Sequence, residues 1–540
     1  MPEGILVFHN TTYAIYQSDG TRILLDKEPR LSSLIPGDTV RYEGTKLMEP
    51  VRRQSQTTLG IIRGLVRGQA YLFCPLLKSL YNPAIPRTSD MTVGDRYMIS
   101  IAPDFTPPVI LSSLGSVYNR LADLSATHAI YMNSGTAVPL PTHVQTPLYT
   151  KPFEDLSHLP TFSIDPEGSL DADDALTVIC EERRVLVHIV DIHQLITPDL
   201  EAVALQRAFT LYLPNNVTHL LPPEKAEFEF SLKEGQPRHV ITVDLRFDEK
   251  GVIQHYDLYP SLIVNKRAWT YEEVMAEIGN SHNSSNSSNS HSAFAYLQTF
   301  LPLSSAPSIT VPALRQTIDP VTGKLSTFSS ILNTDAAHKI IEVMMIAANL
   351  TVSKHIGASS SVPQRFHAKL PKTVSSVPAV SGNPIVDSFL AMKTFATATY
   401  DTTQQGHFGL QLTSYTHFTS PIRRYFDVII HHLLAGITYE PTALQELLEH
   451  VNRQERTVEL LQKLYVSWKL CDWLQDRIGH VFEGYITGLV GAGVYFLIPD
   501  LMLDGFVHAS KLSIAPVLGQ SVALTLTDVN QITGQTGFKI

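Results

Sequence analysis

The sequence predicts a multidomain protein in which a mixed α+β core is flanked by small all-β barrels. The chain has 540 residues, which at about 100–200 residues per domain corresponds to roughly three or four domains. Short apolar strands separated by Gly, Asp and Pro turns fill both ends, whereas the middle alternates between strand and helix patterns. Hydrophobic residues make up 44% of the chain and charged residues 17%, which excludes a mostly disordered protein.

Two successive sets of short strands predict two barrels, over residues 1–55 and 56–112. Each set has about 50 residues and contains a Gly-Asp turn followed by an aromatic strand, at Gly37-Asp38 and at Gly94-Asp95. This weak internal repeat indicates a duplicated small β-barrel. We expect residues 113–160 to form a linker into the core.

The core is expected to span residues 161–478. Strand patterns such as RRVLVHIVDI alternate with helical stretches such as TYEEVMAEI, and a long helical pattern runs from Leu444 to Arg477. The Asn- and Ser-rich segment 280–292 predicts a disordered surface insert. Residues 479–540 return to short strands with Gly turns, which predicts one more five-stranded barrel.

Charge and cysteine usage limit the type of protein. The formal net charge of −10 requires any nucleic-acid site to be a local groove of Lys and Arg. Cys74, Cys180 and Cys471 lie too far apart for a disulfide framework or a metal motif. No apolar run approaches the ~18 residues of a membrane helix, since the stretch 340–352 contains Glu342, and no signal pattern opens the chain. We expect the cytoplasm or another reducing intracellular compartment, neither secretion nor a membrane span.

The segment IDPEGSLDADDAL carries four aspartates within ten residues, Asp165, Asp171, Asp173 and Asp174. Carboxylates this close raise one another's pKa unless a cation intervenes. Mg²⁺ is commonly held by one or two carboxylates, and a pair of ions about 4 Å apart could act on a phosphodiester. A solvated acidic turn is an equally good interpretation of this segment alone, whereas an EF-hand is excluded because its spacing is absent.

Other motifs decide between these interpretations. They are RAFTLYLPNN (207–216), KRAWTYEEV (266–274), IEVMMIAAN (341–349), RFH (365–367) and GHFGLQLTSYTHFTSPIRRYFDVIIHHLL (406–434). Together with the acidic segment they resemble, collinearly and over nearly the whole chain, the ribonuclease II/R family, whose catalytic core is the RNB domain. The resemblance implies two cold-shock-type OB barrels before that core and an S1-type OB barrel after it.

The resemblance also implies an activity, which is processive, hydrolytic degradation of single-stranded RNA from the 3′ end to nucleoside 5′-monophosphates. The implied cofactor is Mg²⁺, as two ions, with Mn²⁺ as an alternative. The chain begins in a barrel pattern and ends at Lys539-Ile540, which favours the ribonuclease II type over the larger, duplex-degrading members. We expect a monomer that binds single-stranded RNA and no membrane, with association with an RNA-degradation complex left open.

The resemblance assigns roles to the acidic and basic residues. Asp165 and Asp174 match ligands of the first metal ion, whereas Asp171 and Asp173 match the second-metal and catalytic side, with Asp173 the most rate-critical. Arg423 matches the arginine that grips the phosphate at the cleavage site, a role that suits its bidentate fork. The neighbouring Arg424 could bind RNA or serve a structural ion pair, and two adjacent arginines alone usually form a solvated face.

Three further residues match RNA-contacting positions. Tyr212 matches a tyrosine that stacks on the 3′ base, although an aromatic before Leu-Pro is more often core packing. Tyr271 and Glu342 match a pair that reads the ribose 2′-hydroxyl, which separates RNA from DNA. Glu342 alone would be an ordinary helix carboxylate, but a charge inside so apolar a helix requires a reason. The second aromatic of the base clamp cannot be placed.

Departures from the family pattern and rival functions complete the prediction. Ser467 stands where the family often has a glutamate, and His432 stands where it usually has an arginine. His407 and His417 are expected to be structural, and Ser420 lacks the context of a nucleophile. The main alternative is a non-catalytic RNA-binding protein on the same fold, whose signature would be loss of an acidic-motif aspartate or of the SPIRRY arginine; all are present. A single-strand-binding module would leave the acidic segment unexplained, and DNA as substrate is disfavoured by the ribose-reading pair.

Overall fold

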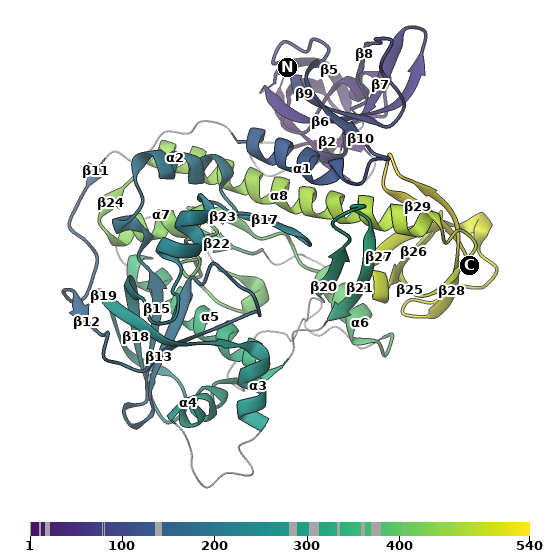
Figure 1. The fold of residues 1–540 in the computed structure, drawn as a ribbon. Coiled ribbons are helices and arrows are strands. Elements are labelled where there is room, and N and C mark those ends of the chain that lie inside the picture. Colours follow the sequence, from purple (N-terminus) through teal and green to yellow (C-terminus); the bar gives the residue numbers. More distant parts are fainter. Residues whose placement is uncertain are drawn as a thin grey trace.

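The computed structural model describes residues 2–9, 12–16, 22–53, 55–77, 79, 81–135, 143–279, 289–301, 313–331, 335–357, 362–368, 380–403 and 406–540. Four clusters of buried apolar side chains divide it into two N-terminal β units, a large central α+β core and a C-terminal β unit. Figure 1 shows the N-terminal sheets above, and the C-terminal sheet below them and beside the core. The predicted α+β core flanked by β units is confirmed at this level.

The two N-terminal units are five-stranded sheets with one connectivity. In each, the first strand of the unit lies in the middle, between its second and fourth strands, giving the orders β3-β2-β1-β4-β5 and β10-β9-β6-β7-β8. The strands are β1 (Glu3–His9), β2 (Thr12–Tyr16), β3 (Arg22–Leu24), β4 (Thr39–Glu43), β5 (Lys46–Arg52), β6 (Gln56–Val66), β7 (Gln69–Phe73), β8 (Ala84–Pro86), β9 (Asp95–Ile101) and β10 (Val109–Ser116).

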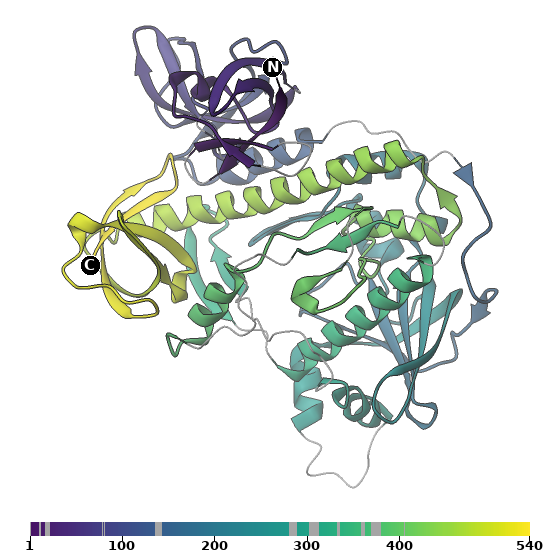
Figure 2. The same ribbon diagram turned by 180° about the vertical axis from the view of Figure 1, so that it is seen from behind.

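The C-terminal sheet repeats this connectivity, with the order β27-β26-β25-β28-β29. Its strands are β25 (Val481–Val490), β26 (Gly493–Ile498), β27 (Leu503–His508), β28 (Ser521–Asn530) and β29 (Gln535–Lys539). The 35-residue helix α8 (Pro441–Gln475) leads into it and places Leu470 and Leu474 in its apolar cluster. Figure 2 shows α8 running beneath the N-terminal sheets from the core to this sheet.

The core is built on a six-stranded sheet of order β12-β19-β13-β14-β15-β18. A further pairing of β18 with β19 closes five of these strands into a ring. The strand β15 is buried along nearly its whole length. Val185, Val187 and Ile189 therefore do not alternate with exposed polar residues, as they would in a sheet with one face in water. The strands are β12 (Glu154–Asp155), β13 (Thr161–Asp165), β14 (Asp174–Ile179), β15 (Arg184–Val190), β18 (Pro237–Phe247) and β19 (Ile253–Thr270).

Helices and short hairpins surround this sheet. The helices are α1 (Ala122–Asn133), α2 (Pro198–Arg207), α3 (Tyr271–Gly279), α4 (Asn289–Gln298), α5 (Ala336–Gly357), α6 (Pro384–Met392) and α7 (Tyr425–Leu434). Four antiparallel pairs join β11 (His143–Val144) to β24 (Ile437–Thr438), β16 (Leu211–Leu213) to β17 (Asn216–Thr218), β20 (Ala313–Ile318) to β21 (Leu325–Ile331), and β22 (Gln364–Phe366) to β23 (Thr399–Asp401).

Two sequence predictions differ from these elements. Residues 280–288 of the predicted insert lie outside the described part of the chain, but its last residues, Asn289–Ser292, begin α4. This helix forms because Phe294 and Leu297 bury their side chains in the core cluster. Among the described helices, α5 alone is long and apolar enough to cross a membrane, by length and composition only. The helix instead packs on β15 and β18 of the core.

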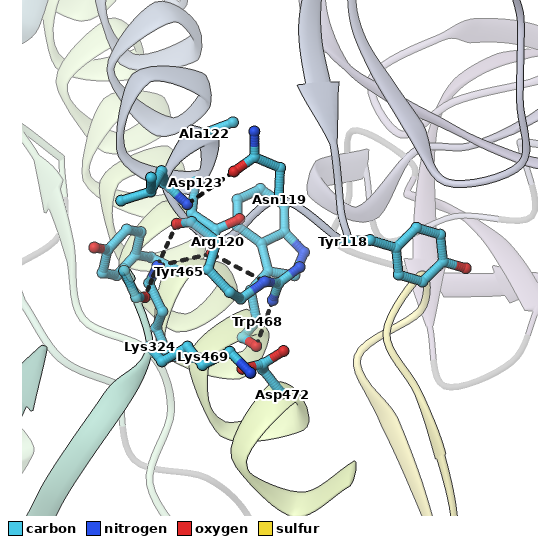
Figure 3. Close-up of polar contacts among 12 residues, drawn as sticks. Tyr118, Asn119, Arg120, Ala122, Asp123, Lys324, Tyr465, Trp468, Lys469 and Asp472 are labelled. Carbon is cyan, nitrogen blue, oxygen red and sulfur yellow. Dashed lines mark hydrogen bonds and ion pairs between the residues drawn. The ribbon is translucent and has the colours of Figure 1, made fainter. Parts of the chain in front are cut away.

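A buried group of charges joins the N-terminal units to the core, and we call it the junction cluster (Arg96, Arg120, Asp123 and Lys469). The carboxylate of Asp123 lies 2.8 Å from Arg96 Nη1, 2.8 Å from Lys469 Nζ and 3.7 Å from Arg120 Nε. Lys469 Nζ also donates to the carbonyls of Arg120 and Gly323, each at 2.7 Å. Figure 3 shows Arg120, Asp123 and Lys469 meeting between α1, α8 and the β20–β21 hairpin.

Candidate active site

A cavity of about 1000 Å³ opens in the core, and segments far apart in the sequence line it. The lining includes side chains from the acidic segment, β16, the start of α3, α5 and the loop before α7. All the residues that the sequence singled out as site candidates lie along this one cavity: Asp165, Asp171, Asp173, Asp174, Tyr212, Tyr271, Glu342, Arg423 and Arg424.

The sheet determines where the acidic segment lies. Asp165 ends β13 and Asp174 begins β14, so the two strands hold the segment between them as a loop. β13 runs parallel to β19 with Asp165 opposite Thr270, and Tyr271 follows directly as the first residue of α3. Carboxyl ends of parallel strands meet at one edge of a sheet, where ligands commonly bind. This register therefore brings a carboxylate and a phenol to the same edge.

Asp165 and Asp174 form a pair of carboxylates that lack a direct cationic partner among the described residues. Burial raises the pKa of Asp165, which is further raised by Asp171 and lowered by a hydrogen bond from Ser163. Burial and the charge of Asp165 raise the pKa of Asp174. Two buried carboxylates without a cationic partner fit a hard divalent cation. Proteins commonly bind Mg²⁺ through one or two carboxylates. In the described part of the chain no three His, Cys, Asp or Glu side chains form a ready metal cage.

Asp171 and Asp173 differ from that pair because protein donors already bind them. Tyr212 Oη donates to Asp171 Oδ2 at 2.9 Å. Burial raises the pKa of Asp171, but the nearby imidazole of His219 and the hydrogen bond from Tyr212 bring the pKa below its ordinary value. Asp173 is 4% exposed and accepts from Ile422 N at 2.7 Å. Burial raises its pKa well above the ordinary range despite the nearby charge of Arg423.

The two arginines of the loop before α7 have different surroundings. Arg423 is 44% exposed at its side chain, lies 3.3 Å from Asp173 through Nε, and donates from Nη2 to Ser420 Oγ at 2.8 Å. Arg423 also lines the cavity, so its remaining N–H groups can meet an anion there. Arg424 Nη2 instead donates to the fully buried Asp427 at 2.8 Å. Arg424 thus makes the structural ion pair that was one of its two predicted roles, although it also lines the cavity.

The aromatic and ribose-reading candidates are accessible from the cavity. Tyr212 is 39% exposed on β16, which contradicts simple core packing, and its backbone carbonyl accepts from Gln462 of α8 at 3.1 Å. Tyr271 is partly buried, and Glu342 is exposed on α5. Glu342 thus lies within an apolar helix, as the sequence indicates, but its charge is not buried because this position lines the cavity.

Sequence reasoning missed one group beside the aspartates. His219 Nδ1 lies 3.6 Å from Asp171 Oδ2, and His219 Nε2 lies 2.8 Å from Glu227 Oε1. The nearby carboxylate of Asp171 and the hydrogen bond with Glu227 raise the pKa of His219 above its ordinary value despite burial. No local signal marks either residue, because His219 follows β17 and Glu227 lies in a π-helical turn, Glu224–Phe230.

His407 and His417, which were expected to be structural, both line the cavity, whereas the two departures from the family pattern, Ser467 and His432, do not. His417 Nδ1 lies 2.9 Å from Tyr400 Oη, and His407 accepts a hydrogen bond from Leu410 N. His432 lies 2.8 Å from Tyr439 Oη, away from the cavity lining. Ser467 faces Gly534 of the C-terminal sheet, where an added Cβ would lie 2.5 Å from the serine Oγ.

Comparisons with known proteins agree with this site. The family model described as "RNB domain" matches residues 153–440. Ribonuclease R of Aquifex aeolicus is 29% identical over 411 residues, covering 66% of this chain and 58% of the relative. The chain thus spans little more than half of that relative.

Solved structures show the same fold across nearly the whole chain. Mycoplasma genitalium RNase R in complex with ribose methylated single-stranded RNA has a TM-score of 0.78 at 17% identity and covers 100% of both chains. Yeast Ssd1, a pseudonuclease, has a TM-score of 0.72 at 16% identity, covering 94% of this chain and 79% of that one.

The matched relatives carry the name ribonuclease R. They correct the expectation of the ribonuclease II type, which rested on where the sequence begins and ends. The family model covers more than half of the residues. The chain belongs to the RNB domain family.

Proposed function

We propose that this RNB-family exoribonuclease degrades single-stranded RNA processively from the 3′ end by metal-dependent hydrolysis, releasing nucleoside 5′-monophosphates. The observation that carries the proposal is the convergence of four aspartates, an arginine, two tyrosines and a glutamate on one cavity. Each of these groups has a distinct use in cutting a terminal phosphodiester, and a binding protein would need few of the carboxylates.

The acidic residues would hold the cofactor. Asp165 and Asp174 are the ligands of one Mg²⁺, with Mn²⁺ as an alternative, and Asp171 and Asp173 serve the second ion and the catalytic side. A bound divalent ion would supply Lewis acidity toward the phosphodiester. Asp173 is held by Ile422 N and Arg423 on both oxygens, so its position is fixed before substrate arrives.

The remaining residues would bind the RNA end. Arg423 offers its unbonded guanidinium N–H groups to the phosphate at the cleavage site, and Arg424 contributes positive charge behind it. Tyr212 stacks on the 3′ base regardless of sequence. Tyr271 and Glu342 hydrogen-bond the ribose 2′-hydroxyl. These roles explain why a nuclease of this kind would accept any base but only ribose.

The three outer sheets would deliver the strand. Their shared strand order is that of a five-stranded OB-type barrel, which supports two cold-shock-type barrels and one S1-type barrel. Such barrels bind single strands by stacking and phosphate contacts. The chain would act as a monomer, with membership of an RNA-degradation complex open. Its three free cysteines suit a reducing intracellular compartment.

A non-catalytic RNA-binding protein is the second candidate, since a pseudonuclease shares the fold. The presence of every acidic-motif aspartate and of Arg423 favours catalysis over this alternative. The two candidate functions can be distinguished by the effect of replacing Asp173, because only an enzyme requires this residue for its activity.

The test incubates a 5′-labelled single-stranded RNA with the purified chain, with and without EDTA. We expect 3′ shortening and release of 5′-monophosphates that EDTA abolishes. Asp173→Asn should lose turnover while its RNA affinity stays within about threefold of wild type. Turnover close to wild type in this variant would contradict the site, and RNA binding without shortening by the wild type would favour the second candidate. Matched DNA and a duplex with a 3′ overhang then test sugar choice and unwinding.

A further inference from the structure

A histidine outside the cavity supports the ring of Tyr271. The rings of Tyr271 and His338 are stacked, with centroids 3.7 Å apart and planes inclined by 11°. His338 lies in the first turn of α5, and Tyr271 begins α3. Offset or parallel ring pairs of this kind stabilise one relative orientation of the two side chains. The imidazole therefore restricts how the phenol ring can turn.

His338 is itself fixed by Asp335, which lies just before α5. Asp335 Oδ2 lies 2.7 Å from His338 Nδ1, and Asp335 Oδ1 accepts from His338 N at 3.1 Å. Although burial opposes it, hydrogen bonding to the backbone and ring of His338 lowers the pKa of Asp335, so this group is a carboxylate. A carboxylate that accepts from Nδ1–H sets both the tautomer and the orientation of the ring.

The arrangement leaves the phenol free for a ligand. Tyr271 and Glu342 line the cavity, whereas His338 is not part of its lining. His338 and Glu342 are four residues apart on α5, so they lie on the same face of one helix. The Tyr271 hydroxyl has no hydrogen-bond partner among the residues that the structure describes. The helix α5 thus carries both His338, which stacks on the phenol ring, and Glu342, which is proposed to bind the ribose together with Tyr271.

We propose that His338, oriented by Asp335, is a positioning residue that sets the selectivity of the site for ribose over deoxyribose. The inference rests on the proposed function, in which Tyr271 and Glu342 read the 2′-hydroxyl. A ring held parallel to the imidazole keeps its hydroxyl at a constant place relative to Glu342. Without that support the Tyr271 side chain can swing about its Cα–Cβ bond, which displaces its hydroxyl, and the 2′-hydroxyl loses one of its two partners in part of the population.

The test compares His338→Ala, His338→Phe and Asp335→Asn on an RNA oligonucleotide and on the same oligonucleotide with deoxyribose in its last three nucleotides. The ratio of kcat/KM for RNA over the chimera is the readout. Loss of an aromatic stacking partner predicts about a 3- to 10-fold lower ratio for His338→Ala. His338→Phe keeps a ring and should restore most of the ratio, and Asp335→Asn should fall between the two. Glu272→Gln, at an exposed neighbouring position, is the matched control.

The outcomes separate this inference from the proposed function. Equal ratios in His338→Ala and wild type, at normal RNA turnover and an unchanged unfolding midpoint, would overturn the positioning role. A wild type without hydrolysis would overturn the proposed function instead. In that case the Kd ratio of RNA to DNA oligonucleotides, measured by fluorescence anisotropy, still decides the role of His338, because sugar selectivity in binding needs no turnover.

Discussion

Replacing Asp123 with asparagine removes the carboxylate that Arg96, Arg120 and Lys469 share. The two shorter contacts are 2.8 Å each, and all of these side chains are at most 3% exposed. Water therefore screens little of the charge, and the variant leaves three buried cations facing backbone carbonyls. Breaking a buried ion pair from one side costs about 3–5 kcal/mol, mostly because the remaining charge is uncompensated. We expect Asp123→Asn to lower the free energy of unfolding by this amount.

Urea unfolding followed by tryptophan fluorescence measures the loss, because Trp468 lies beside the junction cluster, with Arg96 Cζ 4.7 Å from the centroid of its ring. Asp472→Asn is the matched control. Asp472 pairs with Lys324 at 3.7 Å, and the lysine is 57% exposed, so this pair is worth at most about 1 kcal/mol. Equal losses in the two variants would refute the reasoning that burial makes the junction cluster costly to break.

Three further predictions concern RNA binding and pH. Tyr212→Ala should weaken RNA binding by about 1–3 kcal/mol in a filter-binding assay because a base loses its stacking surface, whereas Tyr212→Phe should bind like wild type; equal affinities of all three would exclude stacking. The Kd for RNA should rise steeply and log-linearly with salt if phosphate contacts dominate, and a salt-independent Kd would contradict a basic groove. Burial lowers the pKa of His188 to about 3, whereas the pKa of a histidine in the unfolded chain is near 6.5. Above about pH 6.5 the ring is neutral in both states and does not reduce the free energy of unfolding. Below that pH the unfolded chain binds a proton that the folded chain does not, so the free energy of unfolding falls by about 1.4 kcal/mol per pH unit. His188→Gln should flatten the pH dependence of urea unfolding, and exposed His255→Gln should not; the same slope in both would contradict this assignment.

Local patterns predict much of the fold. Regular apolar spacing predicts the long helix that the structure has as α8, Gly-Asp turns mark the two N-terminal β units, and short strands with Gly turns mark the C-terminal one. The β20–β21 hairpin was not predicted, because the residues that it packs against lie elsewhere in the chain. Ile318 and Leu325 of this hairpin pack into the apolar cluster of the C-terminal sheet. A contact between segments so far apart leaves no periodicity in either one.

The site candidates came from motifs, and the structure brings all of them to one cavity, although their roles stay predictions. What the motifs could not contain are the supporting contacts from other segments. His219 reaches Asp171 from beyond β17, and His338 stacks on Tyr271 from another helix. Neither histidine has a distinctive neighbourhood in sequence. Supporting residues of this kind are defined by three-dimensional proximity and become visible only when the chain is folded.

The helix α8 fixes three separate contacts by its length alone. Gln462 holds the backbone of Tyr212, Lys469 holds the junction cluster, and Leu474 is buried under the C-terminal sheet. One residue inserted between Gln462 and Lys469 would rotate everything beyond it by about 100° and advance it by about 1.5 Å. Both later contacts would then lose their partners at once. Length variation in this stretch should therefore be tolerated, if at all, only in steps close to whole helical turns.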